Sequence, residues 1–467
     1  MSASRIALSQ VAEPVDVSPL RARVAGEVVL PGDESWDAAR QAWNTAVDQQ
    51  PEAVVYAESA DDVVEVVRFA RAHGLRIAPQ GTGHGASALS TEGTILLKTS
   101  RMRGVEIDPV ARRARAEAGA LWIEVVEPAA EHGLVALHGS SPDVGVVGYT
   151  LGGGMGWLAR HYGLATNSVL AVEIVTADGR FVRADRENEP DLFWAVRGGG
   201  GSFGIVTAIE FALYPLTEIY AGTLFFPAER GGEVLHAWRE WVRSVPDKVT
   251  SVGRYLAFPP LPDVPEQLRG GAFAVVELAF QGSGADGDAL VAPLRALGPA
   301  MDTVGVGSPS VLWDLHMDPP APVPGAGDGM LLADAPAEAI DALVEVAGAE
   351  SGSPLLSVEL RQLGGELARP RAENGALASL DAAFALFAVG IAPTPEAKAA
   401  VEQHVDAVRA ALARWEAGRG YMNFVERPVG ARHLYPELTY RRLCQIRAKA
   451  DPTGLLAANH PIPAAGV

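Results

Sequence analysis

The chain has 467 residues, 48% of them hydrophobic, and at roughly 100–200 residues per domain this predicts two or three globular domains. Its formal net charge of -19 disfavours nucleic acids and anionic membrane surfaces as partners, because both are bound through Lys and Arg. The single cysteine, Cys444, excludes an intramolecular disulfide and any zinc or iron–sulfur site built from cysteines.

The first residues lack a basic head followed by a long apolar run, so no signal peptide is expected. The longest apolar tract, residues 380–393, is shorter than the roughly 20 residues that a membrane span needs. A cytoplasmic protein without a membrane partner is therefore the expectation.

The first half of the chain shows alternating strand and helix signals. The first 35 residues predict an entry arm, with a helix over 36–44. Residues 51–80 predict a βαβ unit, in which Ser59 caps the start of the helix and Gly74 ends it. The apolar residues of this helix recur at helical spacing, at Val63, Val64, Val67 and Ala70.

Several further elements follow before residue 215. They are a glycine-rich loop over 81–88, a strand over 93–99, a strand and then a helix over 112–134, a glycine-rich segment over 139–165, a hairpin over 169–184 that turns at Asp178-Gly179, and a helix, glycine hinge and strand over 190–213. From about 220 to 415, strands alternate with Ala-rich helices, which predicts an α+β domain with an antiparallel sheet. The last 50 residues show strand and turn character again.

Two glycine clusters indicate backbone in close contact with a ligand or with another part of the chain. The run Gln80-Gly-Thr-Gly-His-Gly-Ala-Ser87 follows a strand, and its backbone N–H groups suit a phosphate, although a flexible turn would look the same. The row over 145–156 is too dense for an ordinary turn. Packing against a ligand and tight turns under a helix both remain open for it.

Other signatures are missing or misplaced. The glycines at 199–204 fit GxGxxG, but a helix precedes them and a strand follows, which is the reverse of a dinucleotide site and disfavours an NAD-dependent enzyme. The chain has no P-loop, no GxSxG and no HExxH. Its ten histidines lack metal-like spacing, so no metal is expected, and His138, His161 and His433 are interpreted as structural.

Taken together, these segments resemble the FAD-linked oxidases that combine a p-cresol-methylhydroxylase-type FAD domain with a berberine-bridge-enzyme-like C-terminus. The resemblance covers residues 45–465 and rests on GTGHGAS, GVVGYTLGGGMGWLARHYGLA, TADGRFVRAD, PDLFWAVRGGGGSFGIVT and DPTGLLAANHPI. It implies an α+β fold with a two-lobed FAD-binding domain. The expected parts are an FAD-binding domain over 36–215, a substrate-binding α+β domain over 216–414 and a C-terminal segment over 415–467 that returns to the first domain.

The same resemblance implies covalent FAD, bonded to the imidazole of His84, although a histidine that only packs under the flavin is the alternative. Ser141 stands where many relatives carry a second, cysteinyl link, so a single link is expected. Val144 matches a position that gates oxygen, and a small or β-branched residue there favours an oxidase. The expected cofactor-binding set is His84, Gln80, Gly81, Thr82, Gly83, Gly85, Ala86, Ser87, Ser141, Asp143, Val144, Gly145, Gly148, Gly152, Gly153, Gly154, Gly156, Leu158, Ile205, Val206, Tyr421, Asn423 and Asn459.

The chain departs from the family at two further places, at Lys98-Thr99-Ser100 and at Asn167-Ser168, so local cofactor contacts can differ there. The segment beginning at Tyr421 resembles the family's Tyr-x-Asn motif, which makes Tyr421 the candidate proton acceptor. A tyrosine needs a lowered pKa for that role, and a core tyrosine is the alternative. Glu359 and Gln362, on a strand expected over the flavin, are further catalytic candidates.

These observations predict an oxidase that moves a hydride from a CH–OH or CH–NH carbon of a small organic molecule to FAD, with O2 as the second substrate and H2O2 as product. An FAD-dependent dehydrogenase with another electron acceptor, and a flavin-binding protein without turnover, are the alternatives.

Overall fold

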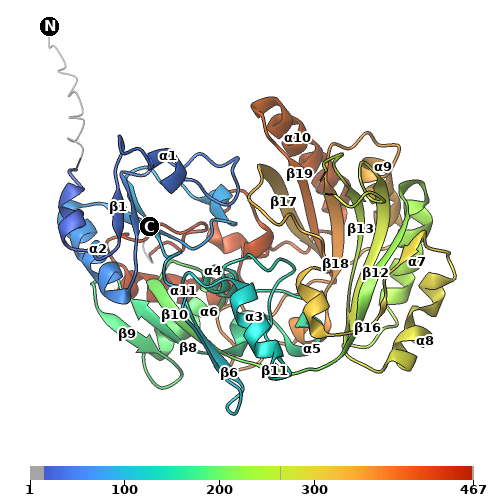
Figure 1. The fold of residues 1–467 in the computed structure, drawn as a ribbon, viewed down its shortest axis with the longest axis horizontal. Helices are drawn as coiled ribbons and strands as arrows, with labels where there is room; N and C mark the ends of the chain where they lie inside the picture. Colours follow the sequence, from blue (N-terminus) through green and yellow to red (C-terminus); the bar gives the residue numbers. More distant parts are fainter. Residues whose placement is uncertain (1–14, 263, 465–467) are drawn as a thin grey trace, which may run out of the picture.

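The computed structural model describes residues 15–262 and 264–464 and shows two halves joined side by side (Figure 1). The blue and green first half carries two small sheets, and the yellow and orange second half carries one large sheet backed by helices. Helix and strand are mixed in both halves, as the α+β prediction requires. Among the described residues, no helix is both long and apolar enough to cross a membrane.

The first lobe is a four-stranded sheet in the order β1-β2-β4-β3. Its elements are β1 (Glu27–Val29), β2 (Ala53–Tyr56), α2 (Ala60–His73), β3 (Arg76–Gln80) and β4 (Thr94–Lys98). Strands β2 and β3 both run parallel to β4, and α2 connects them, which confirms the predicted βαβ unit. The Ser59 hydroxyl accepts from the Asp62 N–H, and Gly74 adopts φ 70°, so both predicted helix ends are also confirmed.

The second lobe is a five-stranded antiparallel sheet in the order β5-β6-β10-β8-β9. Its strands are β5 (Val105–Asp108), β6 (Arg113–Glu117), β8 (Val169–Val175), β9 (Phe181–Ala184) and β10 (Ile205–Ala212), and β7 (Leu134–Val135) pairs β11 (Tyr214–Pro215) beside it. Its helices are α3 (Trp122–Ala130), α4 (Val146–Leu151), α5 (Ala159–Tyr162) and α6 (Pro190–Gly199). The predicted hairpin is β8–β9, and the glycines at 199–204 indeed lie between a helix and a strand.

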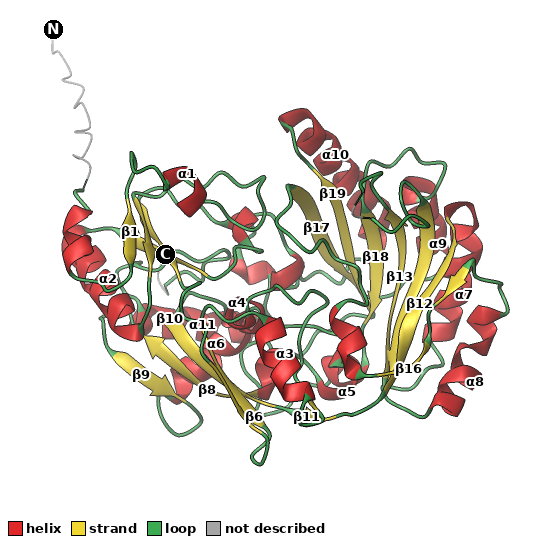
Figure 2. Ribbon diagram, viewed as in Figure 1, coloured by secondary structure: helices red, strands yellow, loops and turns green. Residues whose placement is uncertain are grey.

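The second half is built on an eight-stranded antiparallel sheet in the order β15-β12-β14-β13-β18-β19-β17, with β16 also paired to β12. The strands are β12 (Ile219–Pro227), β13 (Val249–Ala257), β14 (Ala272–Phe280), β15 (Met301–Asp302), β16 (Gly305–Gly307), β17 (Gly325–Leu332), β18 (Ser357–Gln362) and β19 (Phe384–Ile391). The helices are α7 (Gly231–Val242), α8 (Gly284–Arg295), α9 (Ala337–Ala347) and α10 (Pro395–Leu412). These helices cover one face of the sheet (Figure 2), where they bury Trp238, Leu343 and Val405, and the opposite face is turned to the first half.

Short 3-10 helices connect these elements, at Ser18–Ala22, Ala86–Ala88, Ala165–Ser168, Ala228–Arg230, Pro309–Trp313, Gly365–Ala368, Ala413–Trp415, Met422–Phe424 and Ala431–His433. The helix predicted over 36–44 was wrong in length, because α1 covers only Trp36–Ala39. Beyond it the chain is extended, since the Trp43 N–H donates to the Thr82 carbonyl and a bridge joins Asn44 to Val323. The predicted entry arm lies partly outside the described residues, and its described part carries β1.

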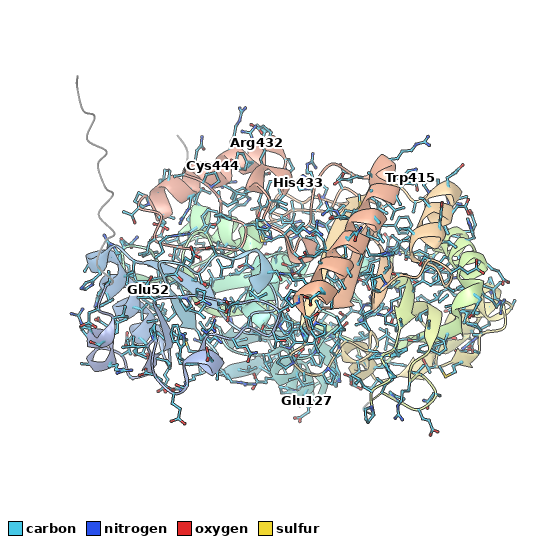
Figure 3. All side chains as sticks on the ribbon, turned by 90° about the horizontal axis from the view of Figure 1, so that it is seen from above. Glu52, Glu127, Trp415, Arg432, His433 and Cys444 are labelled. Atoms are coloured by element: carbon cyan, nitrogen blue, oxygen red, sulfur yellow. The ribbon has the colours of Figure 1, made fainter. Side chains whose placement is uncertain are left out.

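The C-terminal segment returns to the first half, where Figure 3 places His433 and Cys444, whereas Trp415 lies on the second half. The strand and turn character predicted for this segment was wrong, because its main element is α11 (Glu437–Ala450), a 14-residue helix. Its buried face includes Leu443, Cys444 and Ile446, but the Arg and Lys residues on either side of them weaken the apolar period. The end of the segment joins the first sheet, since the Ile77 N–H donates to the Leu455 carbonyl.

Candidate active site

The loop over 81–88 leaves β3 and holds His84 from two sides. Nδ1 of His84 lies 2.6 Å from the Thr82 hydroxyl oxygen. The imidazole stacks on the indole of Trp43, with ring centroids 4.2 Å apart and planes 21° apart. Gly83 adopts φ 87°, which favours glycine, and a Cβ there would lie 2.9 Å from the Cβ of Ala42. The loop backbone therefore fixes the histidine against the segment that connects β1 to β2.

Asp143 forms the centre of the contacts next to His84. Its carboxylate accepts from the Trp43 indole N–H at 2.6 Å and from the Ser141 hydroxyl at 2.7 Å, and one oxygen lies 3.6 Å from His84 Nε2. Burial alone would raise the pKa of Asp143, but these interactions with His84, Ser141 and Trp43 outweigh it and lower the pKa to about 2. Asp143 is therefore a carboxylate at neutral pH that orients three side chains.

The glycine row over 145–156 mostly serves close packing of the chain on itself. A Cβ on Gly152 would lie 1.8 Å from the Asn423 amide oxygen, one on Gly154 would lie 2.5 Å from Tyr149, and one on Gly156 would lie 1.8 Å from the His138 carbonyl oxygen. Gly153, with φ 124°, lies against Tyr421. Gly148 differs, because it is exposed on α4 and a Cβ there would meet no atom within 4 Å.

Tyr421 is buried beside this row, with 2% of its surface exposed. Its hydroxyl oxygen accepts from the Asn423 amide at 3.3 Å, and the Gly154 N–H also donates to it. Burial raises the pKa of Tyr421 well above its ordinary value, and it outweighs these two donors and the nearby positive charge of Arg361, all of which lower it. Tyr421 is thus a neutral phenol at neutral pH, with N–H donors directed at its oxygen.

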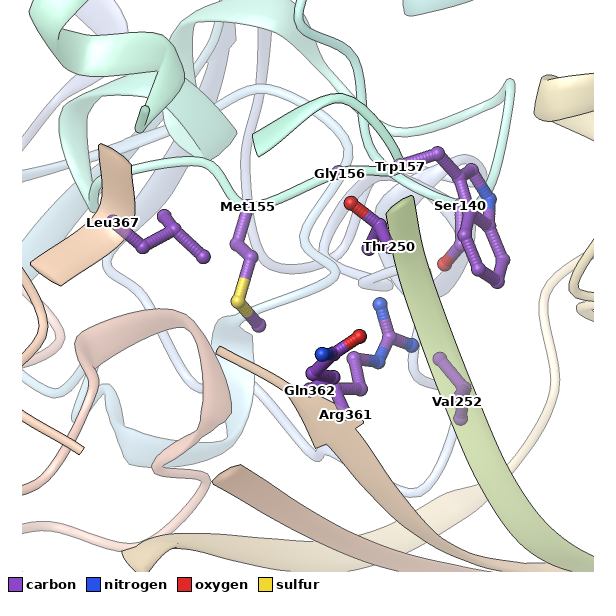
Figure 4. Close-up of a pocket in the computed structure, with 9 residues that line it drawn as sticks. All are labelled: Ser140, Met155, Gly156, Trp157, Thr250, Val252, Arg361, Gln362 and Leu367. Atoms are coloured by element: carbon purple, nitrogen blue, oxygen red, sulfur yellow. The ribbon is translucent and has the colours of Figure 1, made fainter. Parts of the chain in front are cut away.

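The two candidates on β18 have different partners, and Gln362 also lines the cavity that Figure 4 shows. The Gln362 amide donates at 2.8 Å to the Val242 carbonyl at the end of α7. Glu359 faces the first half, where it is fully buried and pairs with His316 and Arg361. Neither side chain forms a hydrogen bond with Tyr421.

The structure brings some of the remaining predicted residues to the loop and leaves others in the core. The Asn459 amide donates to the Gly85 carbonyl, so the C-terminal segment closes over the loop. A Cβ on Gly145 would lie 3.6 Å from Thr82, which joins the loop to the glycine row. Three predicted residues are buried in hydrophobic cores: Leu158, Ile205 and Val206.

Sequence reasoning missed three residues of this region. Trp43 lies far upstream of His84 and Asp143, and no motif marks it. Tyr149 lies inside the glycine row, and Arg361 lies between the two β18 candidates, where it lines a small cavity between the halves (Figure 4). Strand alternation placed Arg361 on the face of Glu359, which is the one signal that could have indicated it.

The residues present fit a flavin on two observations. Buried polar atoms without a hydrogen-bond partner among the described residues occur in both predicted cofactor segments, at Gln80 Oε1, His84 Nε2 and Tyr149 Oη. Gly148, in the same region, leaves open space where a side chain would project. A ligand with both polar and flat apolar parts would satisfy such a surface. Over the described part of the chain, no group of three or more His, Cys, Asp or Glu is arranged to hold a metal ion.

Comparisons with known proteins agree with this description. A family model described as FAD binding domain matches residues 51–185. The (R)-6-hydroxynicotine oxidase of Paenarthrobacter nicotinovorans is 39% identical over 194 residues, which are 41% of this chain and 42% of that protein, so the chain spans less than half of the length of that relative. The FAD-linked oxidoreductase YvdP of Bacillus subtilis is 31% identical over 314 residues, 66% of this chain and 67% of that protein. The crystal structure of 6-hydroxy-D-nicotine oxidase from Arthrobacter nicotinovorans superposes with a TM-score of 0.81 at 26% identity, over 94% of this chain and 98% of that one.

Proposed function

This chain belongs to the family of FAD-linked oxidoreductases, and on that premise we propose that it is an oxidase of a small organic molecule with one covalent link to its cofactor. FAD, when bound, accepts a hydride from a CH–OH or CH–NH carbon and is reoxidised by O2, which becomes H2O2. The protein's own contribution is to hold the cofactor, to place the substrate and to move a proton.

The observation that carries this proposal is the setting of His84. Its ring is fixed by Trp43 and Thr82, and its Nε2 is buried without a hydrogen-bond partner among the described residues. A rigid imidazole whose Nε2 makes no hydrogen bond and faces the Asp143 carboxylate at 3.6 Å is suited to form a bond to the cofactor. Ser141 offers a hydroxyl in place of a thiol and donates it to Asp143, so we propose His84 as the single anchor.

Tyr421 is the proposed proton acceptor for the substrate. Asn423 and Gly154 direct N–H groups at its oxygen, and such donors stabilise a phenolate more than a phenol. Burial opposes them, so the neutral form prevails at neutral pH, and the rate of proton acceptance is expected to rise with pH. The alternative role for Tyr421 is a core residue whose hydroxyl is simply satisfied.

Oxygen as the second substrate is proposed from Val144, which is half-buried next to Asp143. We propose that the domain over 216–414 supplies the substrate side of the site and that residues 36–215 and 415–467 hold FAD. A dehydrogenase with another electron acceptor would use the same site, and the two are separated by oxygen consumption under substrate turnover.

The first test is acid precipitation of the purified protein, in which covalent flavin stays in the pellet. We expect yellow pellets for wild type and for His132→Ala, a surface histidine control, and a colourless pellet for His84→Ala. Flavin released from wild type into the supernatant would rule out the covalent link. A wild-type protein without any flavin would rule out the oxidase itself.

A further inference from the structure

Five ionic side chains form a continuous row on the face of the large sheet that is turned to the first half. Arg254 on β13 donates to Glu277 on β14, and His316 Nδ1 lies 2.6 Å from the other oxygen of Glu277. His316 Nε2 lies 2.7 Å from Glu359, whose second oxygen accepts from Arg361 Nε at 2.6 Å. Four of them are buried, and Arg361, at the end of the row, is half-buried, with 14% of its side chain accessible.

The row carries an excess positive charge. Each nitrogen of His316 faces a carboxylate oxygen at hydrogen-bond distance, and an unprotonated nitrogen would direct its lone pair at that oxygen, so both nitrogens carry protons. Burial and Arg254 lower the pKa of His316, but Glu277 and Glu359 outweigh them and raise it. Three cations therefore alternate with two carboxylates, and a buried charge without a counter-charge is costly.

The free end of the row is the guanidinium of Arg361. Only its Nε is used by Glu359, and because His316 Nε2 is protonated, it cannot accept from Nη2, 3.0 Å away. Asp318 is the nearest further carboxylate, but it accepts from the Ser140 hydroxyl at 2.8 Å and makes no ion pair with Arg361 within 4.0 Å. Both terminal nitrogens thus retain N–H bonds for another acceptor.

These nitrogens lie in a cavity that offers further donors. Figure 4 shows the guanidinium pointing from β18 toward Thr250, in a small cavity that both residues line. Trp157 also lines it, and its indole N–H is buried without a hydrogen-bond partner among the described residues. Ser140 also lines the cavity and directly precedes Ser141, which donates to Asp143.

We propose that the substrate carries a carboxylate, which pairs with the terminal nitrogens of Arg361 and accepts from the Trp157 indole N–H. This inference rests on the proposed function, because it specifies the substrate of the same site. The carboxylate completes the alternation of charge along the row. A planar guanidinium with two free N–H groups matches the two oxygens of a carboxylate better than the compact ammonium of lysine does. Lysine at this position would therefore replace Arg361 only in part.

The test compares two probes of equal shape, benzoate and its neutral isostere benzamide, by calorimetric titration of the holoprotein. We expect wild type and the surface control Arg68→Gln to bind benzoate at least about tenfold more tightly than benzamide, which corresponds to about 1.4 kcal/mol. In Arg361→Gln the preference disappears, and in Arg361→Lys part of it remains. Trp157→Phe keeps the ring and weakens benzoate binding about threefold or more, with a smaller effect on benzamide.

Equal binding of the two probes by wild type would overturn the proposal, and this result needs no variant to fold. A preference that survives in Arg361→Gln would also overturn it, as would an undiminished preference in Trp157→Phe if the arginine variant does not fold. Failure of the proposed function is a different result. If wild type retains flavin after precipitation but does not prefer benzoate, only the carboxylate site is refuted. If wild type prefers benzoate but holds no flavin, only the oxidase proposal is refuted.

Discussion

Replacing Gly148 with alanine tests whether this position borders the space for a cofactor or is packed against the chain itself. Gly148 is the third residue of α4, and an added Cβ would meet no atom within 4 Å. Alanine is the better helix former by about 1 kcal/mol, so the flavin-free protein is expected to gain up to about that much stability. The matched variant Gly152→Ala places a Cβ 1.8 Å from the Asn423 amide oxygen and is expected to lose about 1–3 kcal/mol.

The assay uses the His84→Ala background, in which we expect FAD to be removable. Denaturant unfolding gives the stability of each flavin-free variant, and quenching of flavin fluorescence gives its FAD affinity. If FAD lies over α4, the methyl group added in Gly148→Ala overlaps it and weakens binding by about 1–3 kcal/mol, on the order of 5- to 150-fold. Unchanged FAD affinity in Gly148→Ala would refute the placement of the cofactor over α4. A flavin-free Gly148→Ala protein that is less stable than its parent would refute the open space at the Cβ position of Gly148.

Three further predictions concern charged and hydrogen-bonding groups. Asp143→Asn should slow flavin attachment about tenfold, measured as pelleted flavin against time. The pKa of Asp143 is about 2 in the folded protein and about 3.9 in the unfolded chain, so wild type should lose stability as pH falls from about 4 toward 2. The variant should not show this loss. Asn423→Leu removes a donor to the Tyr421 oxygen, which raises the pKa of Tyr421 further, so the pH–rate curve should move to higher pH; an unmoved curve would exclude Tyr421 as the proton acceptor. Glu277→Gln removes the carboxylate that pairs with Arg254 and one of the two that face His316, and it should cost about 3–5 kcal/mol in denaturant unfolding, whereas the exposed control Glu233→Gln should leave stability almost unchanged.

The elements that sequence reasoning predicted well are those with local signals. The βαβ unit carries its own cap at Ser59, its own stop at Gly74 and a clear apolar period between them. The β8–β9 hairpin is set by the turn at Asp178-Gly179, where Gly179 adopts φ 81°. Helix α11 lacked such signals, because it begins after Pro436 without a side-chain cap and buries an arginine, Arg447, among its apolar residues. Its helical form depends on what it packs against.

The same distinction holds for the candidate site. The loop that carries His84 is one contiguous motif, so the sequence indicated it directly. The partners of His84 come from elsewhere in the chain: the hydrogen bond from Trp43 to Asp143 joins residues 100 positions apart. The ionic row is harder still, since Arg254, Glu277, His316 and Arg361 each look like ordinary surface residues in the sequence. Only the register of three neighbouring strands reveals that Arg254, Glu277 and Arg361 share one face, and His316 reaches them from a connecting segment outside the strands.

The glycine row over 145–156 shows that a sequence pattern can predict close packing without indicating what the glycines pack against. Its density indicated close packing, and both packing against a ligand and tight turns under a helix were possible causes. At Gly152, Gly154 and Gly156 the structure places the chain itself in contact, through Asn423, Tyr149 and the His138 carbonyl. Substitutions at these three positions are therefore expected to disturb folding whether or not FAD is bound. Gly148 is the position where tolerance should depend on the cofactor, so loss of flavin there, without loss of stability, is the result that distinguishes a binding surface from a packing surface.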